Sequence, residues 1–187
     1  MSIRLRSGGH SFPLENIPQP IAGQGVECNV LTLKTILVPN DVFDPQDAAQ
    51  YLVASGLACD PTEVAVYSDL QQPIVAVMAM DQTCAAMIHA RCGQDVAFTS
   101  PLLWQPKNCT ASVWMYGIDG LLYLKIYRES LRFAEVFSAD SPADASYYLA
   151  LLDREFSFKK DTVYVAEGSF DWLIKEVKPY FKHIVCE

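Results

Sequence analysis

Residues 111–137 read ASVWMYGIDGLLYLKIYRESLRFAEVF, and this stretch decides the fold class. It contains three apolar runs rich in β-branched and aromatic residues, at residues 111–116, 121–127 and 131–137. The runs are separated by Gly117-Ile118-Asp119-Gly120 and by Glu129-Ser130, which are residue types that favour turns between strands. The stretch therefore predicts three strands that follow one another as a meander.

The residues after the meander predict alternating helices and strands. Ser141-Pro142-Ala143-Asp144 begins a helix, because Ser accepts backbone N–H bonds at the N-cap and Pro suits the first helical position. A buried strand is expected over residues 162–166, then a helix capped by Ser169, then a last strand over residues 183–186. The resulting order, β-β-β-α-β-α-β, is that of a ribonuclease H-like domain.

The first hundred residues predict nearly the same order. Ile3 and Leu5 alternate with arginines before Ser7-Gly8-Gly9, a pattern typical of a hairpin whose second strand spans residues 10–14. Residues 15–25 are rich in Pro and Gly and are expected to form a loop. Asp44 and Asp81 are the predicted N-caps of two helices. Further strands are expected at residues 26–38, as one or two strands, and at residues 63–67, 74–79 and 96–99.

The two halves also share a helix pattern. Five residues of the helix after each third strand coincide at a constant offset of 97 positions, since Pro45 matches Pro142 and Tyr51 matches Tyr148. We interpret this as an internal duplication, although any capped helix with an inward Tyr-Leu pair would match as well. The fold prediction is thus an α/β chain with two ribonuclease H-like subdomains, a reduced one over residues 1–105 and a second over residues 106–187.

The charge of the chain excludes one class of partner. The net charge is −8: residues 1–100 carry 4 basic and 10 acidic residues, or −6, and residues 101–187 carry 10 and 12, or −2. Phosphate backbones are bound by clustered Lys and Arg, so a nucleic-acid ligand is not expected.

No stretch approaches the ~20 apolar residues of a membrane span, and the N-terminus lacks a signal peptide, so we expect a cytoplasmic protein without membrane contact. The six cysteines are dispersed and suit a reducing compartment.

Several stretches resemble those of a known family of uncharacterised bacterial proteins, domain-of-unknown-function family 3822. They are residues 2–5 through Phe12, Leu37-Val38-Pro39 followed by Val42-Phe43-Asp44, Asp144 with Tyr147-Tyr148-Leu149, and Val163 to Gly168. The resemblance implies an actin-like ATPase fold and no assigned activity. The chain departs from the family between Leu14 and Val26, where the family has a longer segment with a helix, which is why the first subdomain is expected to be trimmed.

The resemblance also implies where a nucleotide would be held between the two halves. Actin-like ATPases use glycine-rich hairpin turns for the phosphates and a Gly-rich strand-to-helix turn for adenosine. The corresponding residues here are Gly8, Gly9, Gly117, Asp119, Gly120, Gly168 and Ser169. No aspartate precedes the first turn, no Ser or Thr follows the second, and Glu167 stands in the third. We predict degraded nucleotide positions and no cofactor, and the alternative interpretation is that these glycines only make turns.

Catalytic groups of other kinds are not expected. A nuclease on this fold needs acidic side chains in the opening strand of a subdomain, and neither opening strand contains Asp or Glu. Cys84 and Cys92 fall on the apolar stripe of their helix while His89 can point elsewhere, so a thiol nucleophile with a base is disfavoured. No metal site is predicted.

The sequence leaves three function hypotheses. The leading one is a non-catalytic binding or scaffolding protein with an unidentified protein partner. Trp104, in the Leu-Leu-Trp connection between the halves, is a candidate anchor for that partner unless the connection tucks back onto the body. The second hypothesis is a nucleotide-dependent switch or weak ATPase that binds Mg-ATP, and the third is a structural subunit of a larger assembly.

Overall fold

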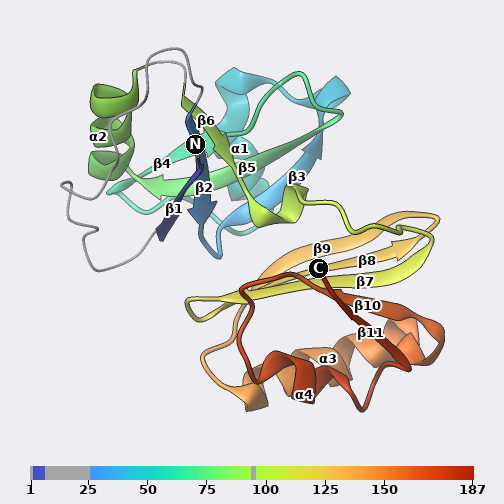
Figure 1. Ribbon diagram of the computed structural model, residues 1–187. Helices are drawn as coiled ribbons and strands as arrows, with labels where there is room; N and C mark the ends of the chain where they lie inside the picture. Colours follow the sequence, from blue (N-terminus) through green and yellow to red (C-terminus); the bar gives the residue numbers. More distant parts are fainter. Residues whose placement is uncertain (1, 7–25, 94–95) are drawn as a thin grey trace. The chain divides into compact units, whose positions relative to one another are not determined.

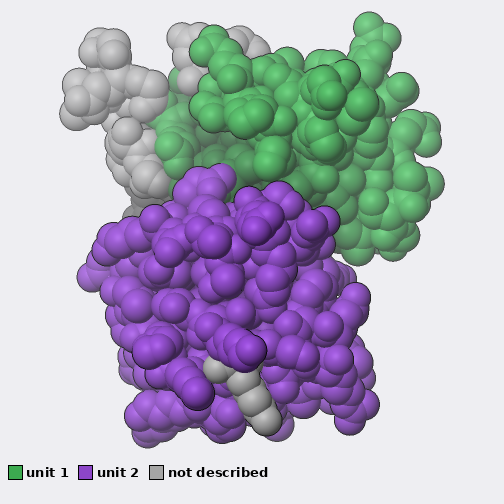
Figure 2. Space-filling model, turned by 90° about the vertical axis from the view of Figure 1, so that its right-hand side faces the viewer, with its two compact units in different colours: residues 1–103 green, residues 104–187 purple. Residues whose placement is uncertain are grey.

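The computed structural model describes residues 2–6, 26–93 and 96–187 (Figure 1). The chain divides into two compact units, Met1–Leu103 and Trp104–Glu187, which Figure 2 colours separately. This division falls two residues before the boundary that the sequence predicts. Gly8 and Gly9, with the predicted strand over residues 10–14, lie outside the described residues.

The described strands of unit 1 form two three-stranded sheets. The parallel sheet has the strand order β1-β2-β6, from β1 (Ser2–Arg6), β2 (Val26–Leu31) and β6 (Val96–Thr99). The antiparallel sheet has the order β3-β5-β4, from β3 (Thr35–Pro39), β5 (Ile74–Asp81) and β4 (Glu63–Tyr67). Two strands are therefore found over residues 26–38. Within the described residues, β1 pairs in parallel with β2. The predicted hairpin gave β1 only an antiparallel partner over residues 10–14.

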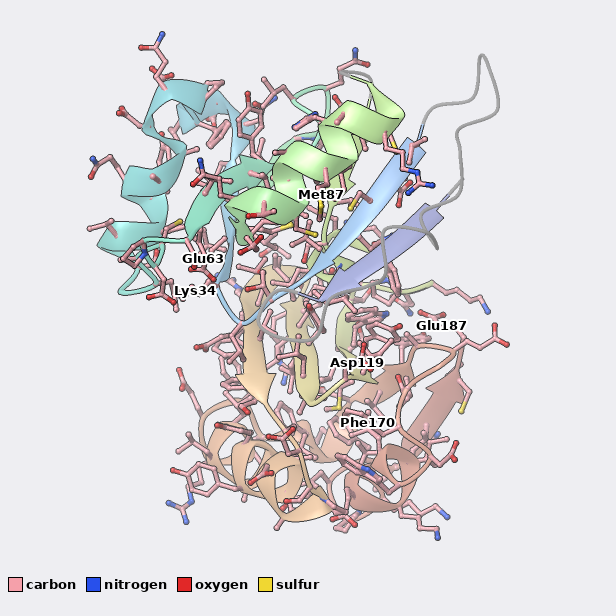
Figure 3. The ribbon with its side chains drawn as sticks, turned by 90° about the vertical axis from the view of Figure 1, so that its left-hand side faces the viewer. Lys34, Glu63, Met87, Asp119, Phe170 and Glu187 are labelled. Atoms are coloured by element: carbon pink, nitrogen blue, oxygen red, sulfur yellow. The ribbon has the colours of Figure 1, made fainter. Side chains whose placement is uncertain are left out.

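Helices pack on both faces of the antiparallel sheet of unit 1. α1 (Ala48–Ala54) packs through Ala48 and Leu52 on β3 and β5, and it follows a short 3-10 turn capped by the Asp44 side chain. α2 (Gln82–Cys92) begins where Asp81 Oδ1 accepts the Cys84 N–H at 2.9 Å, as predicted, and buries Ile88. Lys34 forms ion pairs with Asp60 at 2.8 Å and with Glu63 at 2.6 Å. Lys34 and Glu63 are labelled in Figure 3.

Unit 2 has one five-stranded sheet in the order β11-β10-β7-β8-β9. The chain order is β7 (Ala111–Ile118), β8 (Leu121–Arg128), β9 (Ser130–Ser138), α3 (Pro142–Phe156), β10 (Thr162–Val165), α4 (Leu173–Val177) and β11 (His183–Cys186). β7, β8 and β9 form an antiparallel meander, whereas β10 pairs in parallel with both β7 and β11. The element order β-β-β-α-β-α-β predicted for this half is confirmed. α3 begins at the predicted stretch, where Ser141 and Asp144 form a capping box.

The core of unit 2 lies between the sheet and its two helices (Figure 1). Because side chains alternate along a strand, Met115 and Leu124 face the helices while Trp114 and Lys125 point to the other face. On the helix-facing side, β7 and β8 contribute aliphatic residues and methionine while β9 adds Phe133 and Phe137. On the opposite side, β7 and β8 carry aromatic and polar residues. Among the described residues, no helix is long and apolar enough to cross a membrane.

Candidate functional site

The edge of the unit 2 sheet where β7 and β10 end brings two connections together. β7 and β10 run parallel, with Met115 opposite Val165. Parallel strands point their carboxyl ends to the same edge, which is where ligands bind in sheets of this kind. The turn after β7, residues 119–120, and the connection after β10, residues 166–172, therefore meet at this edge.

The turn after β7 is shorter than the sequence suggests. β7 extends to Ile118, which pairs with Leu121 of β8, so that only Asp119 and Gly120 connect the strands. Their φ angles are 50° and 75°, as a two-residue type I′ hairpin turn requires. Gly117, expected in the turn, instead belongs to the strand, because cross-strand pairing continues to Ile118.

The connection after β10 is hydrogen-bonded along the end of β7. The Ala166 N–H donates to Met115 O at 2.9 Å, and the Phe170 N–H donates to Gly117 O at 2.9 Å. The Ser169 hydroxyl accepts the Gly117 N–H at 3.2 Å and donates to Ala166 O at 2.6 Å. Both backbone groups of Gly117 are thereby bonded within the protein.

Phe170 occupies the space beside Gly117. A Cβ added at Gly117 would lie 2.5 Å from Cδ2 of Phe170 and 3.3 Å from Cδ2 of Leu173. Real side chains do not approach this closely, so a glycine is needed here to let the Phe170 ring pack on the strand. Gly117 therefore allows the Phe170 side chain of the same unit to pack closely against β7.

A pocket of about 420 Å³ lies over these two connections. It is lined by Gly117, Ile118, Asp119, Gly168, Ser169, Phe170, Asp171 and Trp172. Four of the seven residues predicted for a nucleotide thus meet in one pocket, namely Gly117, Asp119, Gly168 and Ser169. Gly120 forms the adjoining turn and does not line the pocket.

The lining of this pocket is acidic and aromatic. Asp119 and Asp171 are exposed carboxylates, and no Lys or Arg is among the lining residues. The rings of Phe170 and Trp172 are stacked, with centroids 4.8 Å apart and planes 13° apart. Asp119 and Phe170 can be followed in Figure 3. A phosphate group would meet two negative charges here, and the amides of Gly117 and Phe170 that could have bound it are already bonded.

Sequence reasoning missed Phe170, Asp171 and Trp172 because it placed the helix start too early. Ser169 was predicted to cap this helix, and that prediction is wrong: α4 begins at Leu173. The Ser169 hydroxyl is held by Gly117 and Ala166, which leaves residues 170–172 in the connection. The sequence Ser169-Phe170-Asp171 is compatible both with a helix start and with a connection that lines a pocket. No local signal in the sequence distinguishes these two structures.

Trp104, at the start of unit 2, is not among the residues that line this pocket. It is half-buried, and its ring contacts Trp114 edge-on at 6.1 Å between centroids and Tyr116 at 5.0 Å. Within its own unit the connection is folded back onto the sheet. Binding of a partner through Trp104 stays a prediction.

The contact of Trp104 includes a buried lysine. The Lys125 ammonium donates to Trp104 O and lies 4.3 Å from the centroid of the Trp114 ring. Lys125 is fully buried, and desolvation lowers its pKa to about 7 despite smaller opposing effects of Cys109 and Glu187. This lysine is therefore poised to lose its proton near neutral pH inside the protein.

Metal-binding side chains do not gather in the described part of the chain. No group of three or more His, Cys, Asp or Glu residues there is arranged to hold a metal ion. At the pocket, Asp119 and Asp171 are the only two such side chains among the lining residues.

Comparison with known proteins identifies the fold. The chain is similar in structure to a Bacteroides thetaiotaomicron protein with an actin-like ATPase fold and unknown function, with a TM-score of 0.70 and 15% sequence identity over 87% of this chain and 68% of that one. A second match is the cytoplasmic domain of EpsL, an inner-membrane component of the type II secretion system of Vibrio cholerae. That match has 12% sequence identity and covers 88% of this chain and 80% of that one. Its TM-score is 0.43, and nothing is inferred from it. Neither a family model nor a curated protein sequence matches.

The chain therefore has an actin-like ATPase fold, as the resemblance implied. A likeness at 15% identity extends to the fold alone and brings no activity with it. Membership of domain-of-unknown-function family 3822 stays a prediction.

Proposed function

We propose that this chain is a non-catalytic binding or scaffolding protein built on an actin-like ATPase fold. The observation that carries the proposal is that protein groups fill the end of β7 at Gly117. In this unit, the strand end expected to hold phosphate has its N–H bonded to Ser169 and its open space filled by Phe170. Protein groups thus occupy the N–H of Gly117 and the space beside this glycine, which a phosphate approaching this strand end would need.

The proposal includes two ribonuclease H-like subdomains, the first one reduced. Unit 2 supports this with a meander followed by two parallel strands on the β7 side, separated by helices. Unit 1 supports a reduced form, since those of its strands that the structure describes divide into two sheets of three. Under this interpretation, the pocket at residues 117–119 and 168–172 occupies the second phosphate and adenosine positions of the fold.

The electrostatics of the pocket point the same way. A triphosphate carries several negative charges, and Coulomb repulsion from Asp119 and Asp171 opposes its entry. Mg²⁺ bound with the nucleotide would offset part of this repulsion, because one or two carboxylates together with phosphate oxygens and water can hold it. The exclusion of Mg-ATP in this proposal therefore rests mainly on the closed strand end at Gly117.

The alternative, a nucleotide-dependent switch or weak ATPase, makes the opposite prediction in a thermal shift experiment. A ligand at a hundredfold its dissociation constant stabilises the folded state by about 2.7 kcal/mol. We expect no saturable rise in melting temperature when Mg-ATP is titrated against the full chain up to millimolar concentration.

A matched pair of glycine variants makes the outcome interpretable. Gly168 lines the pocket at φ 81°, and Gly56 lies in unit 1 at φ 74°, so alanine strains the backbone similarly at both positions. A saturable rise with Mg-ATP that Gly168→Ala abolishes and Gly56→Ala preserves would establish the switch hypothesis in place of ours.

A further inference from the structure

We propose that the pocket formed by residues 117–119 and 168–172 binds the guanidinium group of an arginine side chain on a protein partner. This inference rests on the proposed binding function and names the partner chemistry. It starts from the pocket itself, whose volume of about 420 Å³ lies at the small end of the range for ligand sites. A single long side chain suits such a volume.

The first requirement for an arginine site is negative charge without a competing cation. Asp119 and Asp171 both line the pocket, from the β7–β8 turn and from the connection before α4. Both are exposed, and no Lys or Arg lines the pocket to neutralise them. Carboxylates form short, charge-assisted hydrogen bonds with guanidinium groups, and these are stronger than neutral ones.

The second requirement is a flat surface on which the guanidinium plane can stack. Trp172 can provide it: one face of its ring stacks on Phe170 with the planes 13° apart, so a guanidinium in the pocket would stack on the opposite face. Neither ring is fully buried. Trp faces attract cations most strongly among the aromatic residues, and a planar guanidinium both stacks and forms bidentate hydrogen bonds, which an ammonium does not. The wall therefore favours arginine over lysine.

The third requirement is a rigid frame, and the hydrogen bonds of the connection supply it. Phe170 is tied to β7 through its N–H bond to Gly117 and its ring contact with that glycine. Asp119 is placed by a two-residue turn. A pre-organised site loses little conformational entropy when it binds.

The experiment uses three tripeptides, Ac-Gly-Xaa-Gly-NH₂, in which Xaa is arginine, lysine or citrulline. Citrulline has nearly the shape of arginine but no charge. Binding to the ¹⁵N-labelled full chain is followed by NMR through the Trp172 indole N–H and the Gly168 amide. We expect saturable shifts with the arginine peptide, and an affinity at least tenfold lower for the citrulline peptide and severalfold lower for the lysine peptide.

Two variants locate the site. The double substitution Asp119→Asn/Asp171→Asn should weaken arginine binding at least tenfold, whereas Asp140→Asn, at an exposed position of the same unit outside the pocket lining, should leave it unchanged. Equal affinity for arginine and citrulline, no saturable shift at all, or equal binding by the double variant would each overturn the inference. Saturable Mg-ATP binding would overturn the proposed function and, with it, this inference. If neither Mg-ATP nor the arginine peptide binds, only this inference is overturned.

Discussion

The ring of Phe170 lies where a side chain at position 117 would have to be, with only 2.5 Å between its Cδ2 atom and a Cβ built on Gly117. The same pair is joined by the Phe170 N–H bond to Gly117 O at 2.9 Å. A glycine that would suit phosphate approach is therefore used to seat an aromatic ring. This relationship underlies the first prediction.

Substitution of Gly117 by Ala should destabilise the protein through overpacking. We expect a loss of about 1–3 kcal/mol in the free energy of unfolding, measured by urea denaturation. In a Phe170→Ala background, the same substitution should cost at least about 1 kcal/mol less, because the clashing ring is gone. An equal cost in both backgrounds would show that Phe170 does not exclude the side chain.

The Ser169 hydroxyl should contribute to stability through the bonds it makes with the end of β7. Ser169→Ala removes the acceptor for the Gly117 N–H and the donor to Ala166 O. Because these backbone groups are buried, we expect a loss of about 1–3 kcal/mol in the free energy of unfolding. Ser130→Ala, at an exposed position of the same unit, is the control and should change stability by less than about 0.5 kcal/mol. Equal effects of both variants would contradict the role given to Ser169.

Lys125 should make the stability of the protein depend on pH. Desolvation holds its pKa in the folded state at about 7, against about 10.4 for an unperturbed lysine, so the unfolded state binds more protons between these values. By linkage, stability rises with pH across that window. It is lowest below pH 7, where Lys125 is protonated in both states and folding must bury its charge. We expect a gain of about 2 kcal/mol from pH 7 to pH 9.

The variant Lys125→Met isolates this effect, since it keeps the length of the side chain and removes the titrating group. The difference in free energy of unfolding between wild type and variant should change in favour of the wild type as pH rises. Cys28 and Tyr127, whose pKa values burial raises to about 12, oppose the gain at higher pH, but they are present in both proteins. A pH-independent difference would mean that Lys125 keeps its proton throughout.

Much of the secondary structure could be predicted because its signals are local. Asp81 and Ser141 accept N–H bonds from their own helices, so a cap residue before an apolar stripe was sufficient to locate each start. The strands of unit 2 followed from apolar runs divided by turn residues.

The features that escaped prediction depend on contacts between distant residues. Gly117 and Ser169 are 52 positions apart, and their hydrogen bond keeps Ser169 from capping α4. The division of unit 1 into two sheets depends on parallel pairing of β2 with β1 and β6, which no local pattern encodes. The family resemblance indicated Gly117, Asp119, Gly168 and Ser169 as candidate site residues, whereas it did not indicate Phe170, Asp171 and Trp172, which line the same pocket.

The most direct test of the central claim, that protein groups close the phosphate position of unit 2, is an NMR titration of the ¹⁵N-labelled full chain with Mg-ATP. The amides to follow are those of Asp119, Gly168 and Phe170, which line the pocket. Our account predicts that none of them shifts saturably up to millimolar Mg-ATP. Saturable shifts of these amides, absent with Mg²⁺ alone, would contradict it.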